Sequence, residues 1–219
     1  MGFYRGPNIV TDGLVFAVDA GSERSYPGSG TTTTSLVGSS TGTLSNGVAY
    51  VSGNGGSWDF DGVDDYIDTT FTLPAGNRSM DFWVYYNTLS STSGGGYSLM
   101  GVQQSGGKYL YSGIQSNGSG YSYAGNTGGS YSYTFSAATW YHITLTMGSG
   151  TSRNYVNGEQ VATKTYTSSV ASTTEVMIGA INQQHEIDGL VPLTRIYNKA
   201  LTASEVLQNY NAQKTRFGL

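Results

Sequence analysis

The chain has 219 residues and a formal net charge of −4, and only 11% of its residues are charged. An average domain carries about 25% charged residues, so solubility here depends on hydroxyl and amide groups. Without a basic stripe the chain is not expected to bind nucleic acid, and no apolar run approaches the length of a membrane span. The absence of cysteine excludes a disulfide scaffold and thiolate metal sites.

The N-terminal part alternates between short apolar segments and long polar ones. Residues 1–12 are expected to form an N-terminal arm, and Leu14–Val18 is a short apolar run that predicts the first buried strand. Residues 22–48 are rich in Ser, Thr and Gly, which predicts a long surface excursion with one short strand.

Residues 58–68 hold five of the fourteen acidic residues around a tight Asp/Gly turn. Gly62 can take a positive φ without steric cost, so the pattern predicts a strand, a sharp corner and a second strand. Asp61, Asp64 and Asp65 offer several hard oxygen atoms from one turn, which suits a calcium site. Their spacing does not match an EF-hand loop, and an ordinary acidic turn is the alternative interpretation.

Tyrosine dominates the middle of the chain, where Arg78–Tyr86, Tyr97–Val102 and Lys108–Ile114 predict strands. A Tyr-Ser-Tyr unit occurs at residues 121–123 and again at 131–133, which predicts paired rings on one face of adjacent strands. Such rings suit stacking on sugars or a protein interface; the alternative is one row in the core and one solvated row. The candidate carbohydrate-binding residues are Tyr109, Tyr111, Tyr121, Tyr123, Tyr131 and Tyr133.

The last third contains the clearest strand and turn signals. Residues 140–147 alternate, so Tyr141 and Ile143 are expected to face inward and His142 to be a surface histidine. Asn157-Gly158 between apolar runs predicts a type I′ hairpin. After strands at 175–181 and 190–197, the sequence Thr202-Ala203-Ser204-Glu205 is a capping box that predicts a helix over 202–213.

About a dozen short strands with Gly/Asn turns predict an all-β fold, an antiparallel two-sheet jelly-roll sandwich with a short C-terminal helix. Because no charge run or proline-rich linker divides the chain, residues 1–219 are expected to form a single domain.

Several segments resemble a known family. The corner Phe60–Ile67, the pair Trp140–Ile143 and Tyr155–Glu159, and the closing stretch Arg195–Val206 resemble laminin-G-like, concanavalin-A-like lectin/glucanase jelly rolls. Gly13–Gly21 and Leu207–Ala212 resemble such domains in tailed-bacteriophage virion structural proteins. The resemblance implies a virion location and a structural or accessory role, such as capsid decoration or a fibre-like surface subunit.

Catalysis is not expected. A glucanase needs two carboxylates about 5–10 Å apart. Glu186-Ile187-Asp188 resembles the catalytic strand of related glucanases, but Leu190 stands where that pattern has a further Glu. Only His142 and His185 are available, so a zinc site or a serine-hydrolase triad is not expected either.

Three functions therefore remain at this stage. The first is a non-enzymatic virion protein that docks on capsid or tail proteins and exposes a lectin-like face toward surface glycans. The second is a free carbohydrate-binding module or lectin, and the third is a glycan hydrolase. A homo-oligomer is compatible with the first function, although no heptad pattern indicates one.

Overall fold

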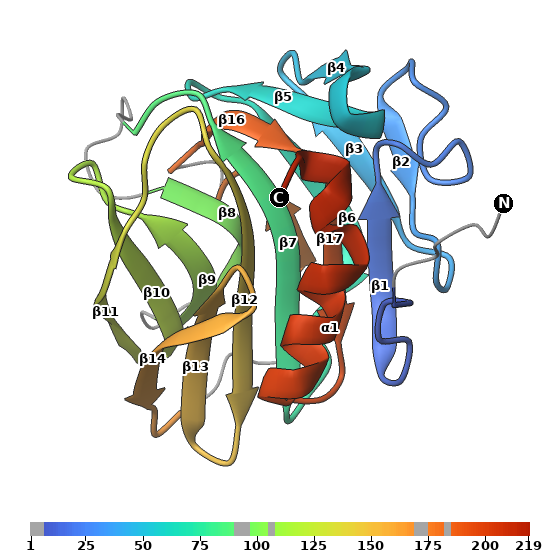
Figure 1. The fold of residues 1–219 in the computed structure, drawn as a ribbon. Coiled ribbons are helices and arrows are strands. Elements are labelled where there is room, and N and C mark those ends of the chain that lie inside the picture. Colours follow the sequence, from blue (N-terminus) through green and yellow to red (C-terminus); the bar gives the residue numbers. More distant parts are fainter. Residues whose placement is uncertain (1–6, 90–96, 105–107, 169–174, 182–184) are drawn as a thin grey trace, which may run out of the picture.

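The computed structural model describes residues 7–89, 97–104, 108–168, 175–181 and 185–219. Two antiparallel sheets pack face to face, and a single helix near the C-terminus lies on the outside of one of them (Figure 1). The predicted all-β, two-sheet jelly-roll sandwich with a short C-terminal helix is thus confirmed. Among the described residues, no helix is long and apolar enough to cross a membrane.

The nine-stranded sheet is built around β7, which pairs with β12 on one side and with β16 and β17 on the other. Pro192 separates β16 from β17 on that side, because proline has no N–H to donate to the ladder. Its strands are β1 (Leu14–Asp19), β4 (Ala49–Val51), β5 (Ser57–Asp61), β7 (Arg78–Tyr86), β12 (Trp140–Gly148), β13 (Thr151–Val156), β14 (Glu159–Thr165), β16 (Asp188–Val191) and β17 (Leu193–Tyr197).

The eight-stranded sheet forms the second layer, in the order β11-β10-β9-β8-β15-β6-β3-β2. The surface excursion predicted over residues 22–48 contributes two of these strands, β2 and β3, rather than one. The strands are β2 (Thr32–Thr34), β3 (Thr41–Ser45), β6 (Tyr66–Thr72), β8 (Tyr97–Gln104), β9 (Lys108–Ile114), β10 (Ser119–Gly125), β11 (Thr127–Thr134) and β15 (Glu175–Ile178).

The predicted Asp/Gly corner carries the chain from one sheet to the other, since β5 belongs to the nine-stranded sheet and β6 to the eight-stranded sheet. Gly62 has φ 74°, as the turn pattern requires. A Cβ atom at Gly62 would lie 2.8 Å from Cβ of Asp188, so the close approach of β16 also demands glycine. The corner therefore brings the β5–β6 turn against the start of β16.

The core lies between the sheets and follows the period-two alternation of the strands. Trp58 and Phe60 on β5 and Ile143 on β12 are each 0% exposed and belong to one apolar cluster. The Asn157-Gly158 hairpin is confirmed: these residues have φ 51° and 84°, the signs that a type I′ turn needs.

The helix α1 (Ala203–Gln213), followed by the 3-10 turn η2 (Lys214–Phe217), starts at the predicted capping box. The Thr202 hydroxyl accepts a bond from the Glu205 amide at 3.3 Å, and the Glu205 carboxylate accepts one from the Thr202 amide at 2.8 Å. A further short 3-10 turn, η1 (Gly53–Gly55), precedes β5. The helix runs across the outward face of β7 and β17 (Figure 1).

A buried polar cluster joins α1 to this sheet, and we call it the Asp81 network. Asp81 on β7 contacts His142 Nε2 at 2.9 Å, Arg195 Nη1 at 3.0 Å and Asn209 Nδ2 at 3.1 Å. Burial alone would raise the pKa of Asp81, but His142, Arg195 and Asn209 hold that pKa well below its usual value. The network is a buried, charged, hydrogen-bonded cluster that attaches the helix to the sheet, rather than an open site.

The expectation that His142 is a surface histidine is wrong. The side chain points away from the sandwich core as predicted, yet it is 0% exposed, because α1 covers this part of the sheet. Strand alternation indicates which side of the sheet a residue occupies, but it cannot indicate what packs on that side.

Candidate functional site

Four tyrosines lie together on the outward face of β9 and β10, and we call them the tyrosine patch: Tyr109, Tyr111, Tyr121 and Tyr123. All four are half-buried, whereas Leu110, Ser112, Ser122 and Ala124 between them face the core and are at most 2% exposed. The rings of Tyr111 and Tyr121 stack with centroids 6.0 Å apart, and those of Tyr109 and Tyr123 lie 4.9 Å apart. The patch is a continuous aromatic surface that is open to solvent on one side.

Mutual packing holds these rings in place. Burial, followed by the neighbouring Tyr121, Tyr123 and Tyr109 hydroxyls, raises the pKa of Tyr111. As in any neutral tyrosine, its hydroxyl can donate a hydrogen bond. Tyrosine combines a flat apolar ring with such a polar group, which suits stacking against a sugar ring.

The two Tyr-Ser-Tyr units do not share a face, contrary to the prediction. In the β10–β11 ladder, Tyr123 pairs with Gly128, and Tyr131 pairs with Gly120. Gly120 faces the core, so Tyr131 lies inside the sandwich and is 6% exposed. The repeat is the same in both strands, but a register offset of one residue reverses the face.

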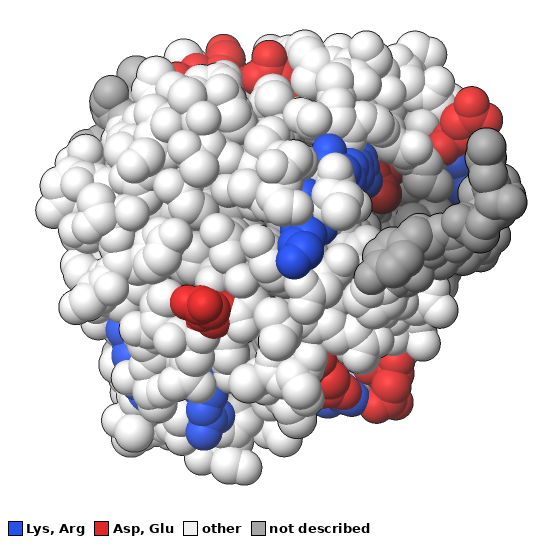
Figure 2. Space-filling model, in the orientation of Figure 1, with Lys and Arg blue, Asp and Glu red and all other residues white. Residues whose placement is uncertain are grey.

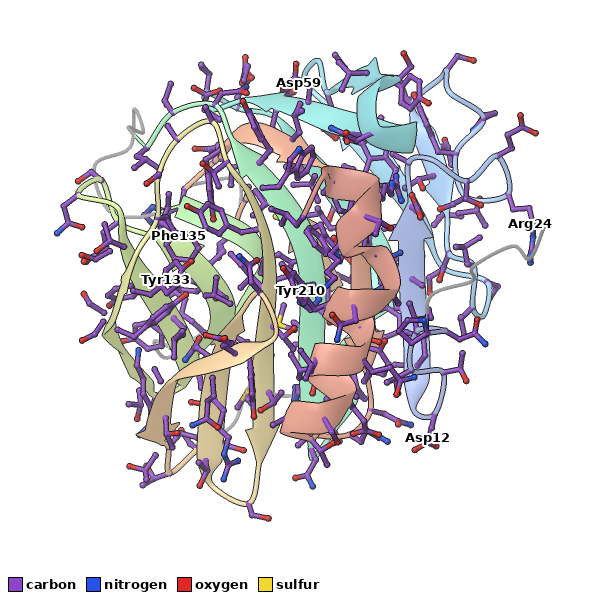
Figure 3. All side chains as sticks on the ribbon, viewed as in Figure 1. Asp12, Arg24, Asp59, Tyr133, Phe135 and Tyr210 are labelled. Carbon is purple, nitrogen blue, oxygen red and sulfur yellow. The ribbon has the colours of Figure 1, made fainter. Side chains whose placement is uncertain are left out.

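Tyr131 and Tyr133 are therefore separated from the tyrosine patch. Tyr133 packs against Phe135 at 4.8 Å and Tyr141 at 6.2 Å, beside the core (Figure 3). Tyr131 has the ammonium group of Lys164 at 5.8 Å from its ring centroid. Burial lowers the pKa of Lys164 to about 8. Tyr131 is thus buried, whereas Tyr133 is half-buried and packs beside the core rather than within the tyrosine patch.

Glycine makes room for the outermost ring of the tyrosine patch. A Cβ atom at Gly128 would come within 2.1 Å of the Tyr123 ring, so that ring lies directly over the Gly128 backbone. Its cross-strand neighbour on the other side is Tyr111 on β9, whose ring centroid lies 5.7 Å away. The glycine-rich segment 125–129 is the sequence signal of this close approach.

A second candidate site is a cleft of about 260 Å³ next to the β5–β6 corner, which we call the acidic cleft. Asp59 and Asp61 point to the same side of β5, and Asp188 on β16 pairs directly with Asp61. Asn87 donates to Asp188 Oδ1 at 3.0 Å. Figure 3 places Asp59 on β5, near the upper edge of the sandwich in that view. The cleft is lined by Gly47, Ala49, Asp59, Phe60, Asp61, Asp65, Asn87 and Asp188.

The carboxylates of the cleft repel one another. Burial, together with Asp61, Asp64 and Asp59, raises the pKa of Asp65 to about 6, although the Asp61 amide hydrogen bond lowers it. Burial raises the pKa of Asp59, and Asp188 and Asp61 add to the shift against the hydrogen bond from Asn87. The predicted metal ligands Asp61, Asp64 and Asp65 do come together, with one oxygen from each within 4.8 Å of the others.

The Glu186-Ile187-Asp188 segment does not form a carboxylate pair in this cleft. Glu186 is 5% exposed, precedes β16 and does not line the cleft, whereas Asp188 does. Asp188 accepts hydrogen bonds from Asn87 and, at 2.8 Å, from Thr88. The carboxylates beside Asp188 come instead from β5, a pairing that no local sequence pattern indicates.

An aromatic row on the nine-stranded sheet was also missed. Trp140 and Tyr85 pair across β12 and β7 with ring centroids 5.3 Å apart, and Leu190 and Asp59 continue the same row. Trp140 packs against Phe217 of η2 at 4.6 Å, so the end of the chain covers part of it. Such a row cannot be deduced from separate strands without their pairing.

Comparison with known proteins supports the architecture. A model of the concanavalin A-like lectin/glucanases superfamily, Laminin_G_3, matches residues 60–207. No match was found among curated protein sequences.

Similar folds occur in solved structures of low sequence identity. Trypanosoma rangeli sialidase in complex with the inhibitor DANA has a TM-score of 0.72 at 16% identity; the match covers 95% of this chain but only 34% of the sialidase chain. Domain 4 of AbnA, a GH43 extracellular arabinanase from Geobacillus stearothermophilus, in complex with arabinotriose, has a TM-score of 0.70 at 16% identity, with 90% and 98% of the chains covered. The botulinum neurotoxin type G receptor binding domain has a TM-score of 0.69 at 16% identity, with 92% and 52% covered. At these identities the likeness concerns the fold alone.

Proposed function

The chain belongs to the concanavalin A-like lectin/glucanases superfamily, and we propose that it is a non-catalytic glycan-binding protein of a virion surface. The observation that carries glycan binding is the tyrosine patch: four half-buried rings, in contact with one another, on a sheet face that no helix of the described residues covers. Because tyrosine combines a flat apolar ring with a hydroxyl, the half-exposed patch suits an extended, uncharged saccharide. AbnA domain 4, which shares the fold, is recorded in complex with arabinotriose, in keeping with this proposal.

The experiment is a glycan array followed by calorimetry with the best ligand, with and without calcium. We expect Tyr121→Ala to weaken binding at least tenfold, about 1.4 kcal/mol, because one stacking surface is removed. Tyr85→Ala serves as the matched control, since Tyr85 is also half-buried but lies on the other sheet. Absence of binding on the array, or loss of binding in the Tyr85 variant but not the Tyr121 variant, would contradict the assignment.

The virion location is supported by the resemblance of Gly13–Gly21 and Leu207–Ala212 to phage virion proteins, and by the low content of charged residues, which are sparse on the face that Figure 2 shows. In this role the protein docks on capsid or tail proteins through one face and exposes the tyrosine patch on another. Mass spectrometry of purified virions tests the location separately from glycan binding. If the protein is missing from intact particles, a free carbohydrate-binding module remains.

A glycan hydrolase is the alternative that the acidic cleft favours, because Asp59, Asp61 and Asp188 meet there. We prefer binding without catalysis, since Asp188 already accepts two side-chain hydrogen bonds and Asp65 is 3% exposed. The glycan that binds best should be incubated with the protein and assayed for new reducing ends. Release that disappears with Asp188→Asn would establish hydrolysis instead.

A further inference from the structure

The acidic cleft holds a buried carboxylate oxygen that has no hydrogen-bond donor. Asp65 lines the cleft and is 3% exposed, and its Oδ2 accepts a hydrogen bond from the Asp61 amide at 3.0 Å. Its Oδ1 is buried without a partner among the described residues, and a Cβ atom at Gly47, on the cleft wall, would lie 3.5 Å from it. Because a buried carboxylate oxygen without a donor is unfavourable, this atom points to a ligand that brings a donor into the cleft.

The cleft also concentrates negative charge without a compensating cation. Asp59, Asp61 and Asp188 line it together with Asp65. In the part of the chain that the structure describes, the ion pairs lie elsewhere, and none of them includes these four aspartates. In Figure 2 the acidic atoms at the top of the view have no Lys or Arg atoms beside them. The electrostatic potential in the cleft therefore favours a positively charged ligand.

A row of apolar side chains leads away from the cleft, and we call it the apolar ledge: Leu190, Tyr85 and Trp140. Leu190 pairs with Asp59 on one side and with Tyr85 on the other, and Tyr85 pairs with Trp140. All three side chains of the ledge are half-buried. A ligand with a positive group and apolar groups next to it can therefore contact the cleft and the ledge at the same time.

The size and the acceptors of the cleft favour a guanidinium group. The volume of about 260 Å³ is smaller than the roughly 300–1,000 Å³ of pockets for drug-sized molecules, so the cleft suits a single side chain. A guanidinium presents five N–H donors in a planar fork and binds carboxylates with two parallel hydrogen bonds. It is also less strongly hydrated than an ammonium group, so it is more easily removed from water.

We propose that the acidic cleft binds an arginine side chain of a partner protein, and that apolar residues next to this arginine lie on the apolar ledge. The guanidinium offsets the charge of the four aspartates and donates to Asp65 Oδ1. A neutral sugar chain is a less suitable occupant, because it brings no charge. The interface is independent of glycan binding and of the virion location, since the tyrosine patch lies on the other sheet.

The test is an amide NMR titration of the whole protein with two capped tripeptides, acetyl-Leu-Arg-Leu-amide and its citrulline counterpart. Citrulline has the size of arginine but carries no charge. We expect the arginine peptide to shift the amide signals of Gly47, Gly62 and Gly189, which lie beside the cleft aspartates. It should bind at least tenfold more tightly than the citrulline peptide, because only a charged fork is offset by the carboxylates.

Three outcomes would overturn the proposal. Equal affinity for the two peptides would mean that apolar contact alone holds them, and no shift with either peptide would mean that there is no site. Shifts that include Asp12, Asp19 and Glu205 to the same extent would indicate non-specific attraction to acidic groups. A calcium salt that shifts the cleft signals and excludes the arginine peptide would assign the cleft to a metal ion instead.

Asp59→Asn locates the contact by removing one charge from the cleft with little change in shape. We expect it to weaken the arginine peptide at least tenfold and to leave the affinity for the citrulline peptide unchanged, a difference that mere misfolding would not produce. Asp68→Asn on β6 is the matched control with the same change of charge outside the cleft, and it should keep the full affinity. Equal affinity of the two variants for the arginine peptide would exclude this site.

Ala49→Lys tests the same cleft with every aspartate in place. Ala49 is exposed and pairs with Asp59, so a lysine there supplies a cation from the chain itself and should compete with the arginine peptide. Thr163→Lys on β14, also exposed, adds the same charge far from the cleft and should leave peptide binding unchanged. Undiminished peptide binding by the Ala49 variant would contradict the proposal.

The two binding proposals can fail separately. Asp59→Asn should retain the affinity for the best glycan of the array, and Tyr121→Ala should retain the affinity for the arginine peptide. Loss of both affinities in Asp59→Asn would place the two ligands on one surface and would overturn a separate arginine site.

Discussion

The outward faces of the two sheets differ in their exposure to solvent. On the nine-stranded sheet, outward side chains such as Asp81, His142 and Arg195 are at most 4% exposed, because α1 packs over them. On the eight-stranded sheet, the outward tyrosines of β9 and β10 remain half-exposed. The comparison shows that a side chain pointing outward from a strand is not necessarily accessible to solvent or to a ligand.

The difference also separates two kinds of chemistry. Below the helix, the charged residues satisfy one another: Asp81 contacts four side chains, including Thr144 at 3.1 Å. In the tyrosine patch, the rings contact one another and the side chains remain half-exposed. We therefore expect changes below the helix to affect stability, and changes in the patch to affect binding.

The largest effect is expected from Asp81→Asn, which leaves the Arg195 charge buried without its partner. Removing one member of a buried ion pair costs about 3–5 kcal/mol, and the free energy of unfolding from urea titration measures it. Asp12→Asn is the matched control: the Asp12 side chain is 84% exposed in its pair with Lys199, so no measurable change is expected. If both variants unfold at the same urea concentration as the wild type, the Asp81 network does not contribute to stability.

The second prediction concerns how the stability contributed by Asp81 depends on pH. The folded-state pKa of Asp81 is depressed, so its contribution is complete above the unfolded value of about 3.9 and is lost as the pH falls below it. The stability gap between wild type and Asp81→Asn should therefore narrow by about 1.4 kcal/mol per pH unit between pH 4 and pH 2. Urea titrations at pH 7, 4, 3 and 2 measure the gap, and a constant gap would mean that Asp81 is not ionised in the folded protein.

The smallest loss of stability is expected from Gly128→Ala, beside the tyrosine patch. The new methyl group would meet the Tyr123 ring at 2.1 Å and displace it, at a cost of about 1–3 kcal/mol. The matched control is Gly53→Ala, where a Cβ atom meets nothing within 4 Å. Near-ultraviolet circular dichroism should report the altered tyrosine stacking in the first variant only. A Gly128 variant as stable as the Gly53 variant, with an unchanged spectrum, would show that the ring is not fixed there.

Local patterns were sufficient wherever neighbours in sequence are also neighbours in space. The Asn157-Gly158 turn and the Thr202–Glu205 capping box depend on interactions within a few residues, and both are present as expected. The alternation of residues 140–147 correctly separated core positions, such as Ile143, from positions on the other face of the sheet, such as His142. The three carboxylates that the sequence suggested for a calcium site, Asp61, Asp64 and Asp65, also lie together because they belong to one turn.

Which residues lie together on one surface was decided by contacts between segments far apart in the sequence. The Tyr-Ser-Tyr repeat looks equivalent in both strands, yet the β10–β11 register places Tyr123 outside and Tyr131 inside. Asp188 joins Asp59 and Asp61 only because β16 lies beside β5. His142 becomes part of a buried ion network only because residues near the C-terminus cover it.

The sequence by itself therefore determined the fold class, the turns, the helix start and the set of candidate residues, because these follow from φ/ψ preferences and from short-range hydrogen bonds. Only the tertiary structure decided which of those residues share a surface. Strand order, register and the docking of α1 depend on contacts between residues far apart in the chain, and no local pattern of one segment carries that information.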